Sequence, residues 1–256
     1  MYIDPTVTAA NVSDWTALGI KLPADLTKLI DAYEALRYVE VGHQPVIDVT
    51  KLKASNAAAE VDKIAGELSL NEQREEAKRR LLATLANKIV REAGDAVPDL
   101  VEQLTPGFET EAAKFAEAVA KLPQELSPET IVASADPSVL TAFGDAKQAA
   151  SHLAAVDAWV AGLSQLPQFA GVESQPVLRV LAPDTHSRLH TLLTARNGVN
   201  HDELVRQINP VFLKAARLGI SFEIHTPREA DQLRQRLEAS KPLTAGQRLI
   251  GMNSRR

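Results

Sequence analysis

The chain has 256 residues, of which 45% are hydrophobic and 24% are charged. This composition is typical of a folded domain and excludes disordered and collagen-like proteins. The absence of cysteine excludes thiol catalysis, zinc–thiolate sites and disulfide frameworks. No apolar run approaches the roughly 18 residues that span a bilayer, and the start of the chain lacks the basic residues of a secretion signal. We therefore expect a cytoplasmic protein, or one within a particle assembled in the cytoplasm, without membrane contact.

The net charge of −5 is divided unevenly along the chain. Residues 176–256 carry 13 basic and 7 acidic side chains, a net +6, whereas residues 1–175 carry 15 and 26, a net −11. At the junction, a stretch poor in charge contains two prolines and a glycine, as linkers do. We therefore predict an acidic helical domain at 1–163, a linker at 164–176, a basic α/β domain at 177–240 and a flexible basic tail at 241–256.

Capping signals predict the helices of the first domain. Thr105, Ser127 and Asp136 each precede a proline, and a capping residue followed by proline is typical of a helix start. Ser69 and Glu72 have the spacing of a capping box. Together with the apolar periodicity, these signals predict helices at 24–40, 55–68, 70–94, 107–122, 128–134 and 137–163.

The apolar residues of these helices recur at steps of three and four, which indicates seams between helices. No stripe persists long enough to favour an autonomous coiled coil, so we predict an antiparallel helical bundle or hairpin. Phe115 and Trp159 lie at seam positions, and we expect them in the core. The fold class is therefore mainly α.

After the linker the pattern changes. Residues 177–181 form a short β-branched and leucine run, and 220–224 alternate between apolar and polar residues, so both ranges are predicted strands. The strands would be parallel if the connection between them is an ordinary βαβ crossover. Helices are predicted at 185–196, at 201–218 with a break at Pro210, and from the Thr226 capping box to Ser240. The second part is therefore a small α/β module with two short strands.

Motifs of catalysis are missing. The chain has no Gly-rich phosphate loop and no nucleophile elbow. His186 and His190 have the spacing of two metal ligands on one helix face, and Asp184 and His201 lie nearby in sequence, but a zinc protease would need Glu where Ser187 stands. We therefore interpret the histidines as structural or surface residues, and we expect no metal, no cofactor and no catalytic residue. An enzyme of unrecognised type remains a second alternative.

Contact with nucleic acid is the first alternative function. Helix 185–196 and the helix from residue 201 imitate a helix-turn-helix, and the module is rich in cations. However, Asp202 and Glu203 stand where a recognition helix meets bases, and Phe222 alternates with apolar residues as a core residue does. Nucleic acid is thus not the favoured partner. The candidate contacts with an anionic partner are Arg179, Arg188, Arg196, Arg206, Lys214 and Arg217.

Helical seams joined to a module of opposite charge suit a protein that makes contacts. We therefore expect a non-catalytic assembly, scaffold or structural protein, acting as a homo-oligomer or as a component of a larger complex such as a phage or viral particle. The opposite charges also predict that the basic module docks on an acidic helical surface, either within one chain or between copies.

Overall fold

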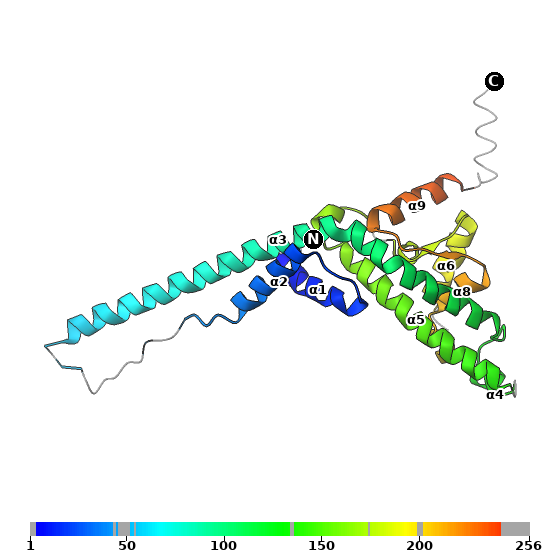
Figure 1. Ribbon diagram of the computed structural model, residues 1–256, viewed down its shortest axis with the longest axis horizontal. Coiled ribbons are helices and arrows are strands. Elements are labelled where there is room, and N and C mark those ends of the chain that lie inside the picture. Colours follow the sequence, from blue (N-terminus) through cyan, green and yellow to red (C-terminus); the bar gives the residue numbers. More distant parts are fainter. Residues whose placement is uncertain are drawn as a thin grey trace, which may run out of the picture. The chain divides into compact units, whose positions relative to one another are not determined.

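The computed structural model describes residues 4–42, 45, 52–53, 55–133, 136–173, 175–198 and 202–241. This part of the chain is mainly helical, with nine α-helices and one two-stranded sheet, which confirms the predicted fold class. The chain forms two compact units (Figure 1). Unit 1 consists of Met1–Val97 with Leu166–Gln168, and unit 2 of Pro98–Gln165 with Phe169–Arg256. The boundary falls inside one helix, directly before Pro98.

Unit 1 contains α1 (Pro5–Ser13), a 3-10 helix (Asp14–Leu18), α2 (Ala24–Arg37) and the first part of α3 (Ala57–Ala120). The sequence analysis did not predict α1 or the 3-10 helix. Asp4 caps α1 by accepting a hydrogen bond from the Thr6 backbone N–H at 2.9 Å. Buried side chains from each element form the core of unit 1: Val12, Trp15, Leu26, Tyr33, Ile89, Val90 and Val97.

The three helices predicted at 55–68, 70–94 and 107–122 are wrong, because α3 is one helix of 64 residues. Ser69 and Glu72 lie inside it, so they do not form a helix-starting capping box. A capping box forms only where the preceding residues leave the helical conformation. Here the preceding segment starts with three alanines at 57–59, which favour helix, and the helix continues through the signal.

The same helix continues through Pro98 and Pro106, although an interior proline costs a helix about 3 kcal/mol. Around Pro106 the apolar face is buried, with Leu104 8% and Phe108 4% exposed. Burying one such side chain contributes about 1.5–3 kcal/mol, which is enough to offset the proline. Thr105 therefore does not cap a new helix: its hydroxyl donates to the Val101 carbonyl inside α3 at 2.8 Å.

Unit 2 begins with a helical hairpin made of residues 98–120 of α3 and of α5 (Pro137–Leu163), which are joined through α4 (Pro128–Ala133) (Figure 1). The caps predicted for α4 and α5 are confirmed: the Thr130 N–H donates to the Ser127 hydroxyl at 3.2 Å, and the Ser138 N–H to the Asp136 carboxylate at 2.8 Å. Phe115 and Trp159 are buried as predicted, at 0% and 6% exposed.

The rest of unit 2 is a chain of short elements. The predicted break in the helix near Pro210 is confirmed, as is the Thr226 capping box. The strand predicted at 177–181 is mostly wrong, because its first residues form a 3-10 helix. Of the strand predicted at 220–224, only two residues form a strand. The elements are a 3-10 helix (Pro176–Arg179), β1 (Leu181–Ala182), α6 (His186–Asn197), α7 (Glu203–Gln207), α8 (Pro210–Arg217), β2 (Ser221–Phe222) and α9 (Pro227–Ala239).

The two strands are antiparallel, with Leu181 opposite Phe222 and Ala182 opposite Ser221. The predicted parallel pairing is therefore wrong. A parallel pair requires one crossover helix that returns the chain to its starting edge. The connection here contains three helices, α6, α7 and α8, of which α6 and α8 pack on each other, and the chain enters β2 in the opposite direction.

The short elements of unit 2 pack on the hairpin of the same unit. The rings of Phe115, Phe212 and Phe222 form an edge-to-face cluster, with centroids 5.8–6.4 Å apart. Phe222 therefore packs against two other rings, as the sequence predicted, and is half-buried. Apolar contact thus contributes to the packing of these short elements on the hairpin within unit 2, and the predicted docking through opposite charges stays a prediction.

Residues 164–176, the predicted linker, include a 3-10 helix (Pro167–Phe169) with buried Phe169, and Leu166 before it is buried as well. In unit 1, the Gln168 side chain donates to the Arg91 carbonyl and to the Asp95 carboxylate, both at 2.9 Å. The predicted domain boundaries stay a prediction. The tail predicted at 241–256 lies, beyond Lys241, outside the described residues. Within the described part, no helix has the length and apolar character of a membrane span.

Candidate functional site

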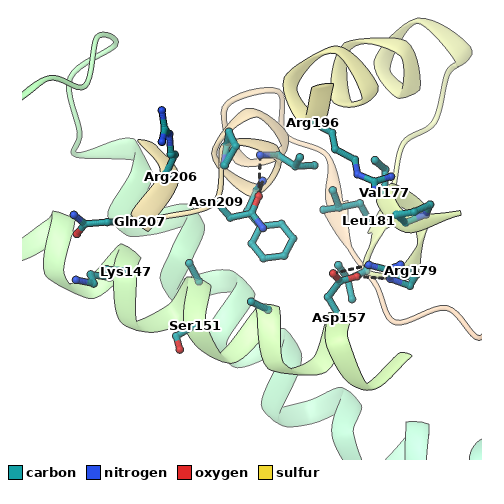
Figure 2. A pocket seen from close by; sticks show the side chains of 17 residues that line it. Lys147, Ser151, Asp157, Val177, Arg179, Leu181, Arg196, Arg206, Gln207 and Asn209 are labelled. Atoms are coloured by element: carbon teal, nitrogen blue, oxygen red, sulfur yellow. Dashed lines mark hydrogen bonds and ion pairs between the residues drawn. The ribbon is translucent and has the colours of Figure 1, made fainter. Parts of the chain in front are cut away.

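A pocket of about 620 Å³ opens in unit 2, between α5 and the short elements that follow it (Figure 2). One wall is α5, which contributes residues from Lys147 to Asp157. The opposite wall is formed by residues 176–181, the end of α6 and the residues at the junction of α7 and α8. Elements that are far apart in sequence thus build one concave site.

Cations outnumber anions in this pocket. Its charged side chains are Lys147, Arg179, Arg196, Arg206 and Asp157. Asp157 accepts two hydrogen bonds from Arg179, from Nε at 2.7 Å and from Nη2 at 2.9 Å. This bidentate pair fixes the Arg179 guanidinium and neutralises it, so the pocket keeps an excess of positive charge, to which Lys147 and Arg196 contribute.

The positive side chains stand around an apolar floor. The floor is formed by side chains of α5, of the 3-10 helix, of β1 and of α8, which include Ala150, Ala154, Val177, Leu181 and Phe212. In Figure 2, Arg196 extends from α6 toward the side of the pocket where Arg179 and Asp157 lie, and Lys147 lies on the other side with Gln207.

Asn209 supports the rim of the pocket from an unusual backbone conformation. Its φ of 62° lies in the left-handed region, and it is the one described residue other than glycine with a positive φ. Its side-chain oxygen caps α8 by accepting from the Val211 N–H at 3.0 Å and from the Phe212 N–H at 3.4 Å. The cap therefore holds the start of α8 at the pocket wall.

The structure distributes the six predicted contacts with an anion over three places. Arg179, Arg196 and Arg206 line the pocket. Lys214 and Arg217 line a second cavity of about 560 Å³, between α6 and α8. Arg188 lines neither cavity, and its guanidinium pairs with Asp184 at 3.2 Å. Sequence reasoning missed Lys147, because nothing in the helical pattern of α5 distinguishes it from an ordinary exposed lysine.

Arg217 has a structural partner. Its guanidinium donates to the Gln124 carbonyl at 2.7 Å and to the Pro123 carbonyl at 2.5 Å, in the connection that follows α3. Burial lowers the pKa of Arg217 from its ordinary value, since the charged form loses hydration. The backbone carbonyls after α3 thus use donors that an outside anion would need.

The two histidines with metal-ligand spacing lie on α6, His186 half-buried and His190 exposed. In the described part of the chain, no three His, Asp or Glu side chains come together as metal ligands would. His201, considered as a third ligand, lies outside the described residues. Asp202 caps α7, accepting from the Leu204 N–H at 2.9 Å.

A second candidate site is the arm, by which we mean residues 57–85 of α3 in unit 1. Every residue of the arm is exposed or half-buried, and burial begins only at Ala86. The arm nevertheless carries large apolar side chains on its surface: Val61 is 65% exposed and Leu68 45%. Sequence reasoning missed the arm, since a periodic apolar stripe on a helix ordinarily indicates a seam with another helix of the same chain.

The segment after α2 contacts the polar end of the arm. Lys78 donates from Nζ to the Arg37 carbonyl at 2.8 Å and to the Val39 carbonyl at 2.7 Å. Gly42, with a φ of 83°, lies so close to the Glu75 side chain that a Cβ there would collide with it. Lys78 thus has partners in unit 1, whereas Val61 and Leu68, nearer the start of the arm, are exposed.

No protein family model, curated protein or solved structure matches this chain.

Proposed function

We propose that this protein is a non-catalytic assembly protein and that the arm is its contact element. The observation that carries the proposal is the pair of exposed apolar side chains near the start of the arm, Val61 and Leu68, which lie on one face of the helix. A long helix without tertiary contacts is only marginally stable in water. Covering each of these side chains contributes up to about 1.5–3 kcal/mol, so a partner helix stabilises both the contact and the arm.

The occupant that we propose is a second copy of the chain. Ala57, Val61, Ile64 and Leu68 follow one another at steps of four, three and four, which is the spacing of a coiled-coil seam. In an antiparallel pair, one register sets Ala57 opposite Leu68 and Val61 opposite Ile64. Every layer of this overlap is apolar, so the start of the arm is complementary to itself.

The overlap ends where the seam becomes polar. The next seam positions are Asn71, Glu75 and Lys78. Lys78 is already bound to backbone carbonyls of its own unit. The contact between two copies is therefore confined to the first turns of the arm, and higher assembly requires further contacts elsewhere.

The charges beside the seam predict how the contact depends on salt. In the register described, Glu60 of one copy stands opposite Glu67 of the other, and the opposite flank pairs the small residues Ala58 and Ala65. Like charges repel, and salt screens the repulsion because the Debye length falls from about 10 Å at 0.1 M to about 3 Å at 1 M. Self-association should therefore strengthen as salt is added.

The basic residues support nucleic-acid contact less well than assembly. Arg179 pairs with Asp157, Arg188 with Asp184, and Arg217 with backbone carbonyls. These three side chains already have protein partners, so they add less to contact with a phosphate backbone than unpaired cations would. Membership of a larger particle, such as a phage or viral assembly, extends the proposal and requires a contact in addition to the arm.

The experiment is analytical ultracentrifugation of the full chain over a range of protein and salt concentrations. We expect a monomer–dimer equilibrium that shifts toward dimer with salt. The double substitution Val61→Gln and Leu68→Gln should weaken it at least about tenfold, because two apolar layers are lost. Leu140→Gln is the matched control, since Leu140 is 62% exposed on α5, in unit 2.

A second pair of variants tests the register. Glu60→Gln and Glu67→Gln, separately and together, should strengthen the dimer at low salt and leave it unchanged at high salt. A chain that is monomeric under all conditions, a dimer that salt dissociates, or an equal effect of Leu140→Gln would refute self-association through the arm.

A further inference from the structure

We infer that the pocket between α5 and the short elements of unit 2 binds a small organic anion, a phosphate monoester or a carboxylate that carries an apolar body. The inference is independent of the proposed assembly, because the arm belongs to unit 1 and every residue of the pocket to unit 2.

The dimensions and lining of the pocket fit a small molecule. Its volume of about 620 Å³ falls within the range of about 300–1,000 Å³ in which ligand sites lie. Such sites are lined mainly by apolar side chains, with a few polar groups that fix the orientation of the ligand. Ala154, Pro176 and Val211, which are exposed or half-buried, provide the accessible apolar surface here, and the cations provide the polar groups.

The charge of the pocket selects an anion. Its single carboxylate, Asp157, is committed to Arg179, and both side chains are largely buried, at 24% and 17% exposed. Arg196 and Lys147 have no ion pair or side-chain hydrogen bond within the described chain, and both are exposed. Their charges point to a partner that brings negative charge into the pocket.

The arrangement also suggests how the ligand lies. Arg196 and the fixed guanidinium of Arg179 lie toward the same side of the pocket (Figure 2). Arg179 uses only two of its donors on Asp157, so further N–H groups remain for an oxyanion. The anionic group should therefore meet Arg196 and Arg179, and the apolar body should cover the floor toward Ala154 and Val211.

A small molecule explains the site better than a nucleic acid. Phe212 is the only aromatic side chain in the lining, and it is 3% exposed and packed edge-on against Phe115 and Phe222. It therefore offers no free face for a base, which single-stranded nucleic acid requires for stacking. The cations surround a concave site and do not follow an extended groove.

The experiment is isothermal titration of the full chain with phenyl phosphate, inorganic phosphate and phenol. Phenyl phosphate has both an anionic group and an apolar ring, whereas inorganic phosphate has only the charge and phenol only the ring. We expect phenyl phosphate to bind at least about tenfold more tightly than inorganic phosphate, because the ring covers the apolar floor. Phenol should show no saturable binding, since it lacks the charge.

Variants test whether the binding occurs in this pocket. Arg196→Gln should weaken phenyl phosphate binding about tenfold, the cost of one charge-assisted contact, and Lys147→Gln somewhat less. Ala154→Leu fills the floor and should abolish the advantage of phenyl phosphate over inorganic phosphate. Arg188→Gln is the matched control, because Arg188 is also an arginine of α6 but lies outside the pocket. Circular dichroism checks that each variant folds.

Some results would contradict the inference that this pocket binds a small organic anion. Equal affinity for phenyl phosphate and inorganic phosphate, or an equal loss in Arg188→Gln, would overturn it. So would tight binding of a single-stranded oligonucleotide that phenyl phosphate does not displace. The variant Val61→Gln with Leu68→Gln should bind phenyl phosphate as the wild type does, so failure of the assembly proposal leaves this result unaffected.

Discussion

Asn209 shows how a single residue can satisfy two requirements that usually conflict. At φ 62° a glycine would be unstrained, but a glycine could not cap α8. Asparagine tolerates the left-handed region better than other residues and also accepts hydrogen bonds from two backbone N–H groups. The cap was predictable from Asn209 preceding Pro210, whereas the backbone conformation depends on how α7 and α8 pack.

We expect Asn209→Ala to destabilise the protein by about 2–3 kcal/mol, because it loses the cap and leaves a Cβ in the left-handed region. Asn209→Gly loses the cap but relieves the strain, so its effect should stay below about 1 kcal/mol. Urea unfolding followed by circular dichroism measures both. Equal losses in the two variants would mean that backbone strain at this position has no energetic role.

At the scale of elements, α3 departs most from its sequence signals. Ser69, Thr105 and Pro106 are each sound local signals of a helix start, and caps of the same kind at Ser127, Asp136 and Thr226 are used. The difference is tertiary: near Pro106, buried side chains on both sides hold the helical path. The local sequence does not determine which apolar face packs against another element. Helical structure was therefore predictable in this part of the chain, but the continuation of α3 through Ser69 and Pro106 was not.

Replacing the interior proline tests this account of α3. Pro106→Ala should stabilise the protein by about 2 kcal/mol, because it restores a helix donor and removes the clash of the ring, less the added flexibility of the unfolded chain. Gly107→Ala is the adjacent control: no atom lies within 4 Å of the Cβ that it adds, and the gain should be about 1 kcal/mol. Denaturant unfolding of both variants gives the comparison. If Pro106→Ala destabilises the protein, the proline contributes a contact or a bend that α3 requires.

At the scale of the whole molecule, the opposite charges of the two parts of the chain were readable from composition, but the packing of unit 2 was not. The ion pair between Arg179 and Asp157 joins the basic part to the acidic part, yet the three-ring cluster around Phe115 supplies the apolar contact. Charge counts indicate which surfaces attract one another. They do not identify the buried side chains that decide the fit, and the pocket beside this contact was therefore only partly predictable.

Limited proteolysis tests the organisation of the chain. The sequence predicts first cuts in residues 164–176, whereas the structure buries Leu166 and Phe169 there and has no buried residue in the arm. A protease cuts where the backbone is exposed and opens locally, so we expect the first cuts between residues 57 and 85. Mass spectrometry of the fragments identifies the cut positions. First cuts near residue 170 would instead support the linker predicted from the sequence.

The three-ring cluster also has a consequence for the order in which the protein is synthesised. Phe115 leaves the ribosome with the first helix of the hairpin, while Phe212 and Phe222, which cover it, are added much later. Because domains acquire their cores only when all contributing segments are present, the nascent hairpin carries an uncovered aromatic face until β2 has emerged. A chain that terminates before α8 should therefore be a client of chaperones, whereas loss of the residues after α9 should leave this core intact.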